Sequence, residues 1–228
     1  SATHPATDSS APTLNPLPTR TACAALAAAL VAAACAGGPG DAPGEALVCG
    51  ASDVPGHFFR QTGGEFTARD LADRHPDPAR REDDLRDAGM TDGYFSYWVE
   101  RVDRPPFDPP AEILCQALIF ADTTRARAFV DNITPSPDEF AATIMGLLPE
   151  DARTIEELPV ADAGLPPASR AFRVIAADDL VEVTLYALIS ANGRYVQSTV
   201  MGDADGRTTI ADVAAVHRAV LGRTLAGR

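Results

Sequence analysis

Apolar and polar residues alternate along two neighbouring stretches near the C-terminal end of the chain, 180–190 and 194–201. Val183 and Leu185 fall on one face of the first stretch, because successive side chains of a strand point to opposite sides. Asn192-Gly193 separates the stretches, and this dipeptide is typical of the type I′ turn, which needs positive φ at both central residues. The pattern therefore predicts a β-hairpin.

The other strands are predicted from their residue types. Residues 113–120 are apolar on both faces, which is typical of a central strand covered on both sides. Residues 93–102 are aromatic and β-branched, and 58–66 and 171–175 are shorter stretches of the same kind. Prolines and acidic residues crowd 150–169 and predict a loop for most of that segment.

Start and stop signals define the predicted helices. Asp77 followed by Pro78 fits an N-cap and a first helical position, and Gly89 fits the end of that helix. Thr67 and Asp122 are N-cap residues too, and apolar residues recur at helical spacing behind Asp122. The predicted helices are 68–74, 78–88, 123–133, 137–148 and 210–225.

The predicted order of elements is β-α-α-β-β-α-α-β-β-β-α. It predicts an α+β fold, in which a mostly antiparallel sheet has helices packed on it. Residues 52–228 have the length of a single domain with its own hydrophobic core. We therefore expect one layered α+β domain at 52–228.

A different pattern precedes this domain. Residues 21–36 carry no charge, Arg20 stands just before them, and glycine and proline follow. This arrangement is typical of a secretory signal, and the stretch is shorter than the ~20 residues that span a bilayer. The sequence predicts a signal peptide at 1–34, with a disordered Ser/Thr/Pro-rich start. The alternative is an alanine-rich buried helix.

The residues Ala-Ala-Ala-Cys at 32–35 resemble the lipobox of bacterial lipoproteins. The resemblance implies that Cys35 receives a lipid and anchors the protein on the outer face of the cell membrane. The glycine- and proline-rich composition of the segment that follows predicts a flexible linker at 35–51. Ala32 stands where that family usually has leucine. Cleavage at an Ala-x-Ala site, which would give a freely secreted protein, is therefore an alternative.

The formal net charge of −13 argues against two classes of partner. Nucleic-acid binding needs a basic face, and so does electrostatic attraction to anionic lipid. We expect no nucleic-acid partner, and we expect membrane contact only through the lipid on Cys35.

Two cysteines, Cys49 and Cys115, would remain in the domain after signal removal and lipid attachment. In an oxidising compartment they are expected to form a disulfide. It would close a loop of about 66 residues and contribute about 4 kcal/mol in the chain-entropy model. The alternative is two free buried thiols.

No catalytic motif stands out along the chain. The histidines lack metal-ligand spacing, there is no nucleophile elbow and there is no Cys-x-x-Cys pair. His217 lies in the last predicted helix and is expected at its surface or boundary. We expect no cofactor, and the sequence indicates no particular enzymatic activity.

Asp203, Asp205 and Asp212 resemble the calcium loop of EF-hand and dockerin modules in their spacing. Met201 occupies the first loop position, where that pattern has a carboxylate. Three interpretations follow: a calcium site, a hydrolase whose carboxylates converge in one cleft, or a polar strand-to-helix turn capped by threonine.

Aromatic residues are concentrated in the first two strands. Phe58, Tyr94 and Trp98 are candidates for the lining of an apolar pocket beneath a helix. The alternative is that they belong to the core.

Residues 70–101 and 118–133 resemble uncharacterised exported proteins of high-GC bacteria, in which a short charged helix ends in Gly and leads to a Gly-Tyr strand. More distantly, the element order is similar to PsbP/Mog1-like lipoprotein domains and to extracellular sensor domains of bacterial Ser/Thr kinases. The more distant resemblances imply binding of a ligand or partner. Together with the export signal and the lack of catalytic groups, they predict a non-catalytic extracytoplasmic module that binds a small ligand or an envelope protein. A purely structural lipoprotein is the other interpretation.

Overall fold

The computed structural model describes residues 43–73, 75–101, 110–136, 140, 143–144, 152–160, 164–177 and 182–226. Within these ranges the chain forms a seven-stranded antiparallel sheet with the strand order β1-β2-β3-β7-β6-β5-β4. The strands are β1 (Phe58–Phe66), β2 (Met90–Glu100), β3 (Glu112–Phe120), β4 (Ala152–Leu158), β5 (Ser169–Ala177), β6 (Glu182–Asn192) and β7 (Tyr195–Asp203).

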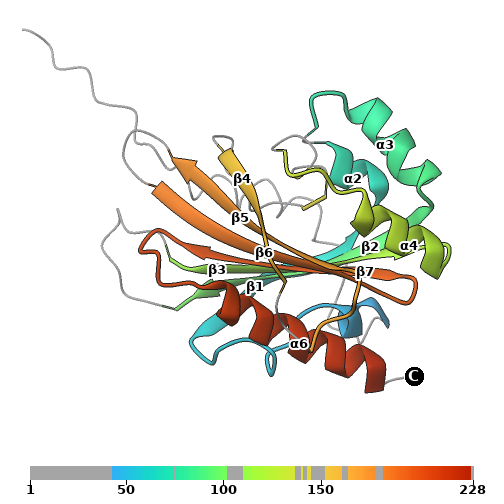
Figure 1. The fold of residues 1–228 in the computed structure, drawn as a ribbon. Helices are drawn as coiled ribbons and strands as arrows, with labels where there is room; N and C mark the ends of the chain where they lie inside the picture. The colour runs from blue at the N-terminus through green and yellow to red at the C-terminus, as the bar shows by residue number, and fades with distance from the viewer. Residues whose placement is uncertain are drawn as a thin grey trace, which may run out of the picture.

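Helices cover both faces of this sheet (Figure 1). They are η1 (Pro43–Leu47), α2 (Ala68–Ala72), α3 (Pro78–Asp87), α4 (Thr123–Asp131) and α6 (Ile210–Ala226). We call the side that α2, α3 and α4 cover the α4 face, and the side that η1 and α6 cover the α6 face. The predicted α+β architecture is confirmed. Among the helices described, none has the length and apolar character that crossing a bilayer requires.

Strand β3 lies near the middle of the sheet, between β2 and β7. Ile113, Cys115 and Ala117 pack on the α6 face, and Leu114 and Leu118 pack on the α4 face. None of the five is more than 2 % exposed. The unbroken apolar run in the sequence is thus explained by burial on both sides, as predicted.

The helix signals in the sequence act as expected. Thr67 and Asp70 form a reciprocal capping box at the start of α2. Asp77 caps α3 by accepting a hydrogen bond from the backbone N–H of Arg80 (3.2 Å). Gly89 follows α3 with a φ of +91°, a conformation that glycine adopts without steric strain.

The hairpin between β6 and β7 forms as predicted, but its turn is displaced by one residue. Asn192 still pairs with Tyr195, so Gly193 and Arg194 are the two central residues. Gly193 has a φ of +63°, and no described residue other than glycine has a positive φ. Positive φ at the first central position alone is typical of Gly-X hairpin turns, not of the expected Asn-Gly turn.

The expectation of a loop over most of 150–169 was wrong, because β4 forms there at the edge of the sheet. Ile155 packs against the core of the α4 face and Leu158 against that of the α6 face. Glu156 and Glu157, which suggested a loop, form ion pairs with arginines of β5. Charged side chains suit an edge strand, since they discourage pairing with another chain.

The folded domain begins before residue 52. Leu47, Val48 and Cys49 are between 2 % and 9 % exposed and pack into the core of the α6 face. Residues 43–51, which the sequence assigned to a linker, are therefore part of the domain. The predicted signal peptide, the lipid site Cys35 and most of the helix expected at 137–148 lie outside the described residues, so these stay predictions.

The predicted disulfide between Cys49 and Cys115 is confirmed, with a Cα–Cα distance of 5.6 Å. It ties the segment after η1 to the central strand β3. The hydroxyl of Ser96 donates a hydrogen bond to the carbonyl of Cys49 (3.0 Å), and Arg223 of α6 donates to the carbonyl of Val48. The N-terminal segment is thus held by both the sheet and α6.

Candidate functional site

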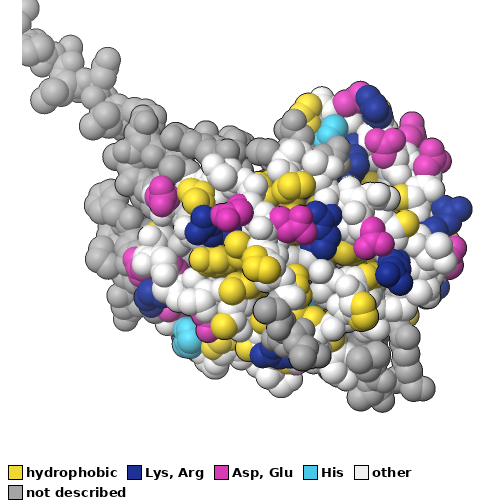
Figure 2. All heavy atoms as spheres, viewed as in Figure 1, with side chains coloured by type: hydrophobic (Ala, Val, Ile, Leu, Met, Phe, Trp, Pro, Cys, Tyr) yellow, Lys and Arg dark blue, Asp and Glu magenta, His cyan; other side chains and the backbone are white. Residues whose placement is uncertain are grey.

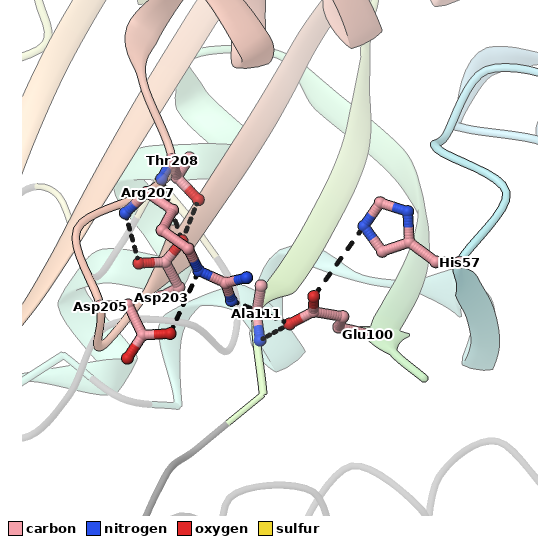
Figure 3. A network of polar contacts seen from close by, with 7 residues as sticks. All are labelled: His57, Glu100, Ala111, Asp203, Asp205, Arg207 and Thr208. Carbon is pink, nitrogen blue, oxygen red and sulfur yellow. Dashed lines mark hydrogen bonds and ion pairs between the residues drawn. The ribbon is translucent and has the colours of Figure 1, made fainter. Parts of the chain in front are cut away.

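A buried carboxylate stands at the end of β2. The side chain of Glu100 is 6 % exposed, and its Oε2 accepts hydrogen bonds from the backbone N–H of Ala111 (3.2 Å) and from Arg207 Nη2 (3.2 Å). His57 Nε2 lies 4.0 Å from Glu100 Oε1. Figure 3 shows these groups meeting from separate parts of the chain. Since Arg207 balances the buried charge of Glu100, the network fastens the β7–α6 turn to the end of the sheet.

The turn from β7 to α6 is built around Asp203, which is 4 % exposed. Its carboxylate accepts hydrogen bonds from the backbone N–H of Arg207 (3.0 Å), from that of Thr208 (2.9 Å) and from the Thr208 hydroxyl (2.8 Å). Gly206 has a φ of +64°, which lets the chain reverse without steric strain. Asp203 therefore serves the backbone of its own turn, as in other turns organised by an aspartate.

The other two carboxylates of the candidate calcium pattern have separate partners. Asp205 pairs with Arg207 Nε (3.1 Å). Asp212 accepts from the N–H (2.9 Å) and the hydroxyl (2.6 Å) of Thr209, and so caps α6. The described residues contain no group of three or more His, Cys, Asp or Glu side chains that could hold a metal ion. Of the three interpretations of Asp203, Asp205 and Asp212, these contacts support the polar strand-to-helix turn, because the three carboxylates have separate partners.

Glu112, at the start of β3, is a carboxyl that the sequence did not single out. Burial raises its pKa, and a hydrogen bond with Tyr97 partly opposes that rise. A raised carboxyl pKa is a signal of functional sites. In the described part of the chain, however, no charged side chain contributes to this shift. Tyr97 is thus the titratable group bonded to Glu112, and no charged partner for paired acid–base chemistry contributes to its shift among the described residues.

His217 is fully buried in α6, at 0 % exposure, which corrects the expectation of a surface or boundary residue. Its Nδ1 lies 3.0 Å from the Thr199 hydroxyl, and its Nε2 lies 2.9 Å from the Ser190 hydroxyl. The Ser190 hydroxyl lies 2.7 Å from that of Ser169, which donates a hydrogen bond to the Pro166 carbonyl (2.7 Å). We call this chain of hydrogen bonds through Thr199, His217, Ser190 and Ser169 the seam. The sequence did not reveal it, because its members lie on three strands and a helix.

The donors and acceptors of the seam determine which ring nitrogen of His217 carries the proton. Ser169 uses its one hydroxyl hydrogen on a carbonyl, so Ser190 must donate to Ser169. Ser190 therefore accepts from His217 Nε2–H, and Nδ1 accepts from Thr199. Burial lowers the pKa of His217 to about 3. The imidazole is thus neutral and donates toward the serine, whereas a general base would accept the serine proton.

The three aromatic residues proposed as a pocket lining share the α6 face. Trp98 is 5 % exposed and belongs to the core there, and its Nε1 donates a hydrogen bond to the Ser96 hydroxyl (3.1 Å). Phe58 and Tyr94 are partly buried against the same core. The Tyr94 ring lies so close to Gly44 that a Cβ at that glycine would come within 1.9 Å of it. Trp98 therefore takes the core role that was the alternative.

A groove with a volume of about 390 Å³ lies on the α4 face, between α3 and α4. Leu85, Ile133 and Thr143 form its buried floor, each less than 9 % exposed. Phe129 of α4 adds a half-buried ring, which packs against that of Phe120 at a centroid distance of 5.0 Å. Figure 2 shows acidic and basic side chains interleaved over α3, at the upper right of the view. The sequence did not predict this groove, since its walls come from two helices far apart in the chain.

A second hollow of about 370 Å³ lies where the start of α4 meets the β6–β7 turn. Its lining includes Asp122, Arg194 and Tyr195, and none of the described residues that line it is buried. A ligand site normally encloses most of its ligand against an apolar lining. By that criterion the groove between α3 and α4 is the better candidate site.

The chain matches no protein-family model and no curated protein. Among solved structures it is similar to the extracellular domain of PknH from Mycobacterium tuberculosis, with a TM-score of 0.52 and 12 % sequence identity. The match covers 80 % of this chain and 94 % of that one.

At this identity the likeness concerns the fold alone. It supports, at the level of the fold, the expected similarity to the extracellular domain of a bacterial kinase. The resemblances to uncharacterised exported proteins and to PsbP/Mog1-like domains stay predictions.

Proposed function

We propose that this protein is an exported, non-catalytic module that binds a small ligand or an envelope partner in the groove between α3 and α4. The groove itself carries the proposal, because a concave site with a mostly apolar buried floor and polar groups at its mouth is typical of ligand sites. Its volume of about 390 Å³ suits a small molecule or a few side chains of a partner.

Three observations favour export. Residues 21–36 have the composition of a secretory signal. The disulfide between Cys49 and Cys115 is of a kind that persists in oxidising compartments. The fold is shared with a domain described as extracellular. A lipid on Cys35 would then hold the domain at the outer face of the membrane, and free secretion is the alternative.

The polar clusters favour binding over catalysis. Glu100 and Asp203 are satisfied by arginine and backbone donors, so their carboxylates stabilise the β7–α6 turn. His217 is fully buried, and its Nε2–H donates a hydrogen bond to the Ser190 hydroxyl. A catalytic base needs an open lone pair within reach of substrate.

Native mass spectrometry of the protein, after incubation with a lipid and metabolite extract of the cell envelope, tests the binding function. Ala128→Trp places a large side chain in the groove, since Ala128 is exposed on α4 and lines it. Ala215→Trp is the matched control on the exposed side of α6. We expect a retained ligand on the wild type and on Ala215→Trp, and none on Ala128→Trp. Retention by all three proteins, or by none, would overturn the proposal.

Intact-mass measurement of the protein from its own membranes tests the anchor. We expect a chain that starts at Cys35 and carries added lipid mass, and a Cys35→Ala variant that is unprocessed or released. A wild-type chain without lipid that starts after a nearby Ala-x-Ala site would indicate secretion. An intact N-terminus would remove the argument for export from residues 21–36.

A further inference from the structure

The two arginines that line the groove are already engaged. Arg125 Nη1 donates a hydrogen bond to the backbone carbonyl of Asp87 (2.8 Å), and Arg125 Nε lies 3.6 Å from the Asp122 carboxylate. Arg81, on the α3 side, also has an interaction partner. Both arginines are therefore already engaged by the protein itself.

The carboxylates at the groove are open. Asp84 and Asp87 are exposed on α3 and line the groove, three residues apart on one side of the helix. Within the part of the chain that the structure describes, neither carboxylate takes part in a hydrogen bond or an ion pair. Among the described residues, the groove thus offers a ligand open carboxylate acceptors, whereas its arginines are engaged.

Part of the lining beside these carboxylates is apolar, next to the polar Thr143 and Asn132. Leu85 and Ile133 are 1 % and 7 % exposed, and the half-buried ring of Phe129 stands beside them. Burial of a hydrocarbon group against an apolar floor is favourable, and an aromatic face attracts a cation. The ligand that suits such a groove therefore has a positively charged hydrogen-bond donor and an apolar part.

We infer that this groove binds an organic cation with an apolar body, whose ammonium or guanidinium group contacts Asp84 and Asp87 while its body lies against Leu85 and Phe129. The net charge of −13 adds a long-range attraction for cations. The inference rests on the proposed binding function and names the chemical class of the ligand.

Titration of the ¹⁵N-labelled protein, followed by amide chemical shifts, tests this class with three matched probes. Phenethylamine is the cation, phenethyl alcohol its neutral counterpart and hydrocinnamate its anionic one. We expect phenethylamine to shift amides of α3 and α4 and to bind about five-fold more tightly than the alcohol, as for a partly exposed ion pair. The preference should shrink as salt is added, because exposed charges are screened.

The double variant Asp84→Asn, Asp87→Asn locates the recognition. It should bind phenethylamine no more tightly than the alcohol. Asp83→Asn is the matched control, because Asp83 is also exposed on α3 and is not among the residues that line the groove. It should keep most of the five-fold preference. The amide spectra of both variants report directly on whether they are folded.

The outcomes separate the ligand class from the binding function. If alcohol or hydrocinnamate binds the groove as tightly as the amine, the cation class is overturned while the groove stays a binding site. If none of the probes shifts α3 and α4, or if the double variant keeps the preference, the inference also fails. The envelope extract tested against Ala128→Trp then decides the proposed function separately.

Discussion

The two faces of the sheet are held by different kinds of interaction. On the α6 face a disulfide ties the segment after η1 to β3, and the buried His217 ties α6 to the strands beneath it. On the α4 face the three helices pack mainly through apolar side chains. One surface is thus closed by covalent and polar bonds, and the other keeps a groove between two helices.

This difference indicates where recognition can occur. A seam of hydrogen bonds beneath a helix resists opening, because each broken bond would leave a buried polar group unpaired. Apolar packing with an open groove can accept a ligand without breaking such bonds. The α6 face thus holds the N-terminal segment, and the α4 face is where the proposed ligand binding is expected.

Replacing both Cys49 and Cys115 by alanine should have the largest effect on stability. The bridge spans 66 residues of sequence, so we expect the free energy of unfolding to fall by about 4 kcal/mol. Urea denaturation followed by the fluorescence of Trp98, the single tryptophan, measures this loss. A loss below about 1 kcal/mol would mean that noncovalent contacts alone hold η1 to the sheet.

The buried, neutral imidazole of His217 should make the stability of the protein depend on pH. In the unfolded state His217 has the ordinary pKa of 6.5, whereas in the folded state its pKa is about 3. The unfolded state therefore holds more protons between these values, and stability falls as the pH falls. Between pH 6.5 and 4 this group should remove about 3 kcal/mol.

His217→Gln should lose that part of the slope, when unfolding is measured by urea at a series of pH values. His75→Gln is the control, because the ring of His75 is bonded to the backbone of Asp77 at the surface. It should follow the wild type. Parallel curves for His217→Gln and the wild type would contradict the buried neutral imidazole.

On the α4 face, Arg170 of β5 links strand β4 to the end of α4 through several hydrogen bonds. Its Nε and Nη2 donate to the Glu157 carboxylate (2.8 and 2.7 Å), and Nη1 donates to the carbonyls of Val130 and Ile133 near the end of α4. The guanidinium also lies 5.1 Å from the centroid of the Phe172 ring. Arg170→Ala should lower the free energy of unfolding by about 2 kcal/mol, measured by urea denaturation.

Glu157→Gln should cost less, about 0.5 kcal/mol, because the carboxylate is 44 % exposed and its charge is screened. The bond from Arg170 lowers the pKa of Glu157, with burial acting in the opposite direction. This contribution is present at neutral pH and is lost as the pH falls through the lowered pKa. A double-mutant cycle with Arg170→Ala measures the pair, and a coupling of zero would contradict it.

Much of the fold could be predicted from sequence because its signals are local. The apolar run of β3 and the caps at Thr67 and Asp77 depend on near neighbours, and all three formed as expected. β4 was missed because an edge strand carries charges whose partners, such as Arg170, lie on the next strand. The cysteine pair was predictable only because export left two candidates.

The site itself depends on contacts between distant parts of the chain. Asp84 of α3 and Phe129 of α4 line the same groove because the two helices lie on one face of the sheet. The seam around His217 likewise joins β5, β6, β7 and α6. The aspartates after β7 suggested a metal site because an Asx-type turn and a calcium loop use the same residues at similar spacing.

The smallest expected effect concerns the groove carboxylates. Asp84→Asn together with Asp87→Asn should change the free energy of unfolding by no more than about 0.5 kcal/mol, since both side chains are exposed and unpaired in the described part of the chain. Urea denaturation checks this. A loss above 1 kcal/mol would give these carboxylates a structural role and weaken their assignment to a ligand.

Hydrogen exchange measured by mass spectrometry, with and without the envelope extract, tests the division between the two faces most directly. We predict that the extract slows exchange in peptides from α3 and α4, and that those from η1 and α6 are unchanged. Slower exchange at η1 or α6 alone, or no change in any peptide, would contradict the assignment of ligand binding to the α4 face.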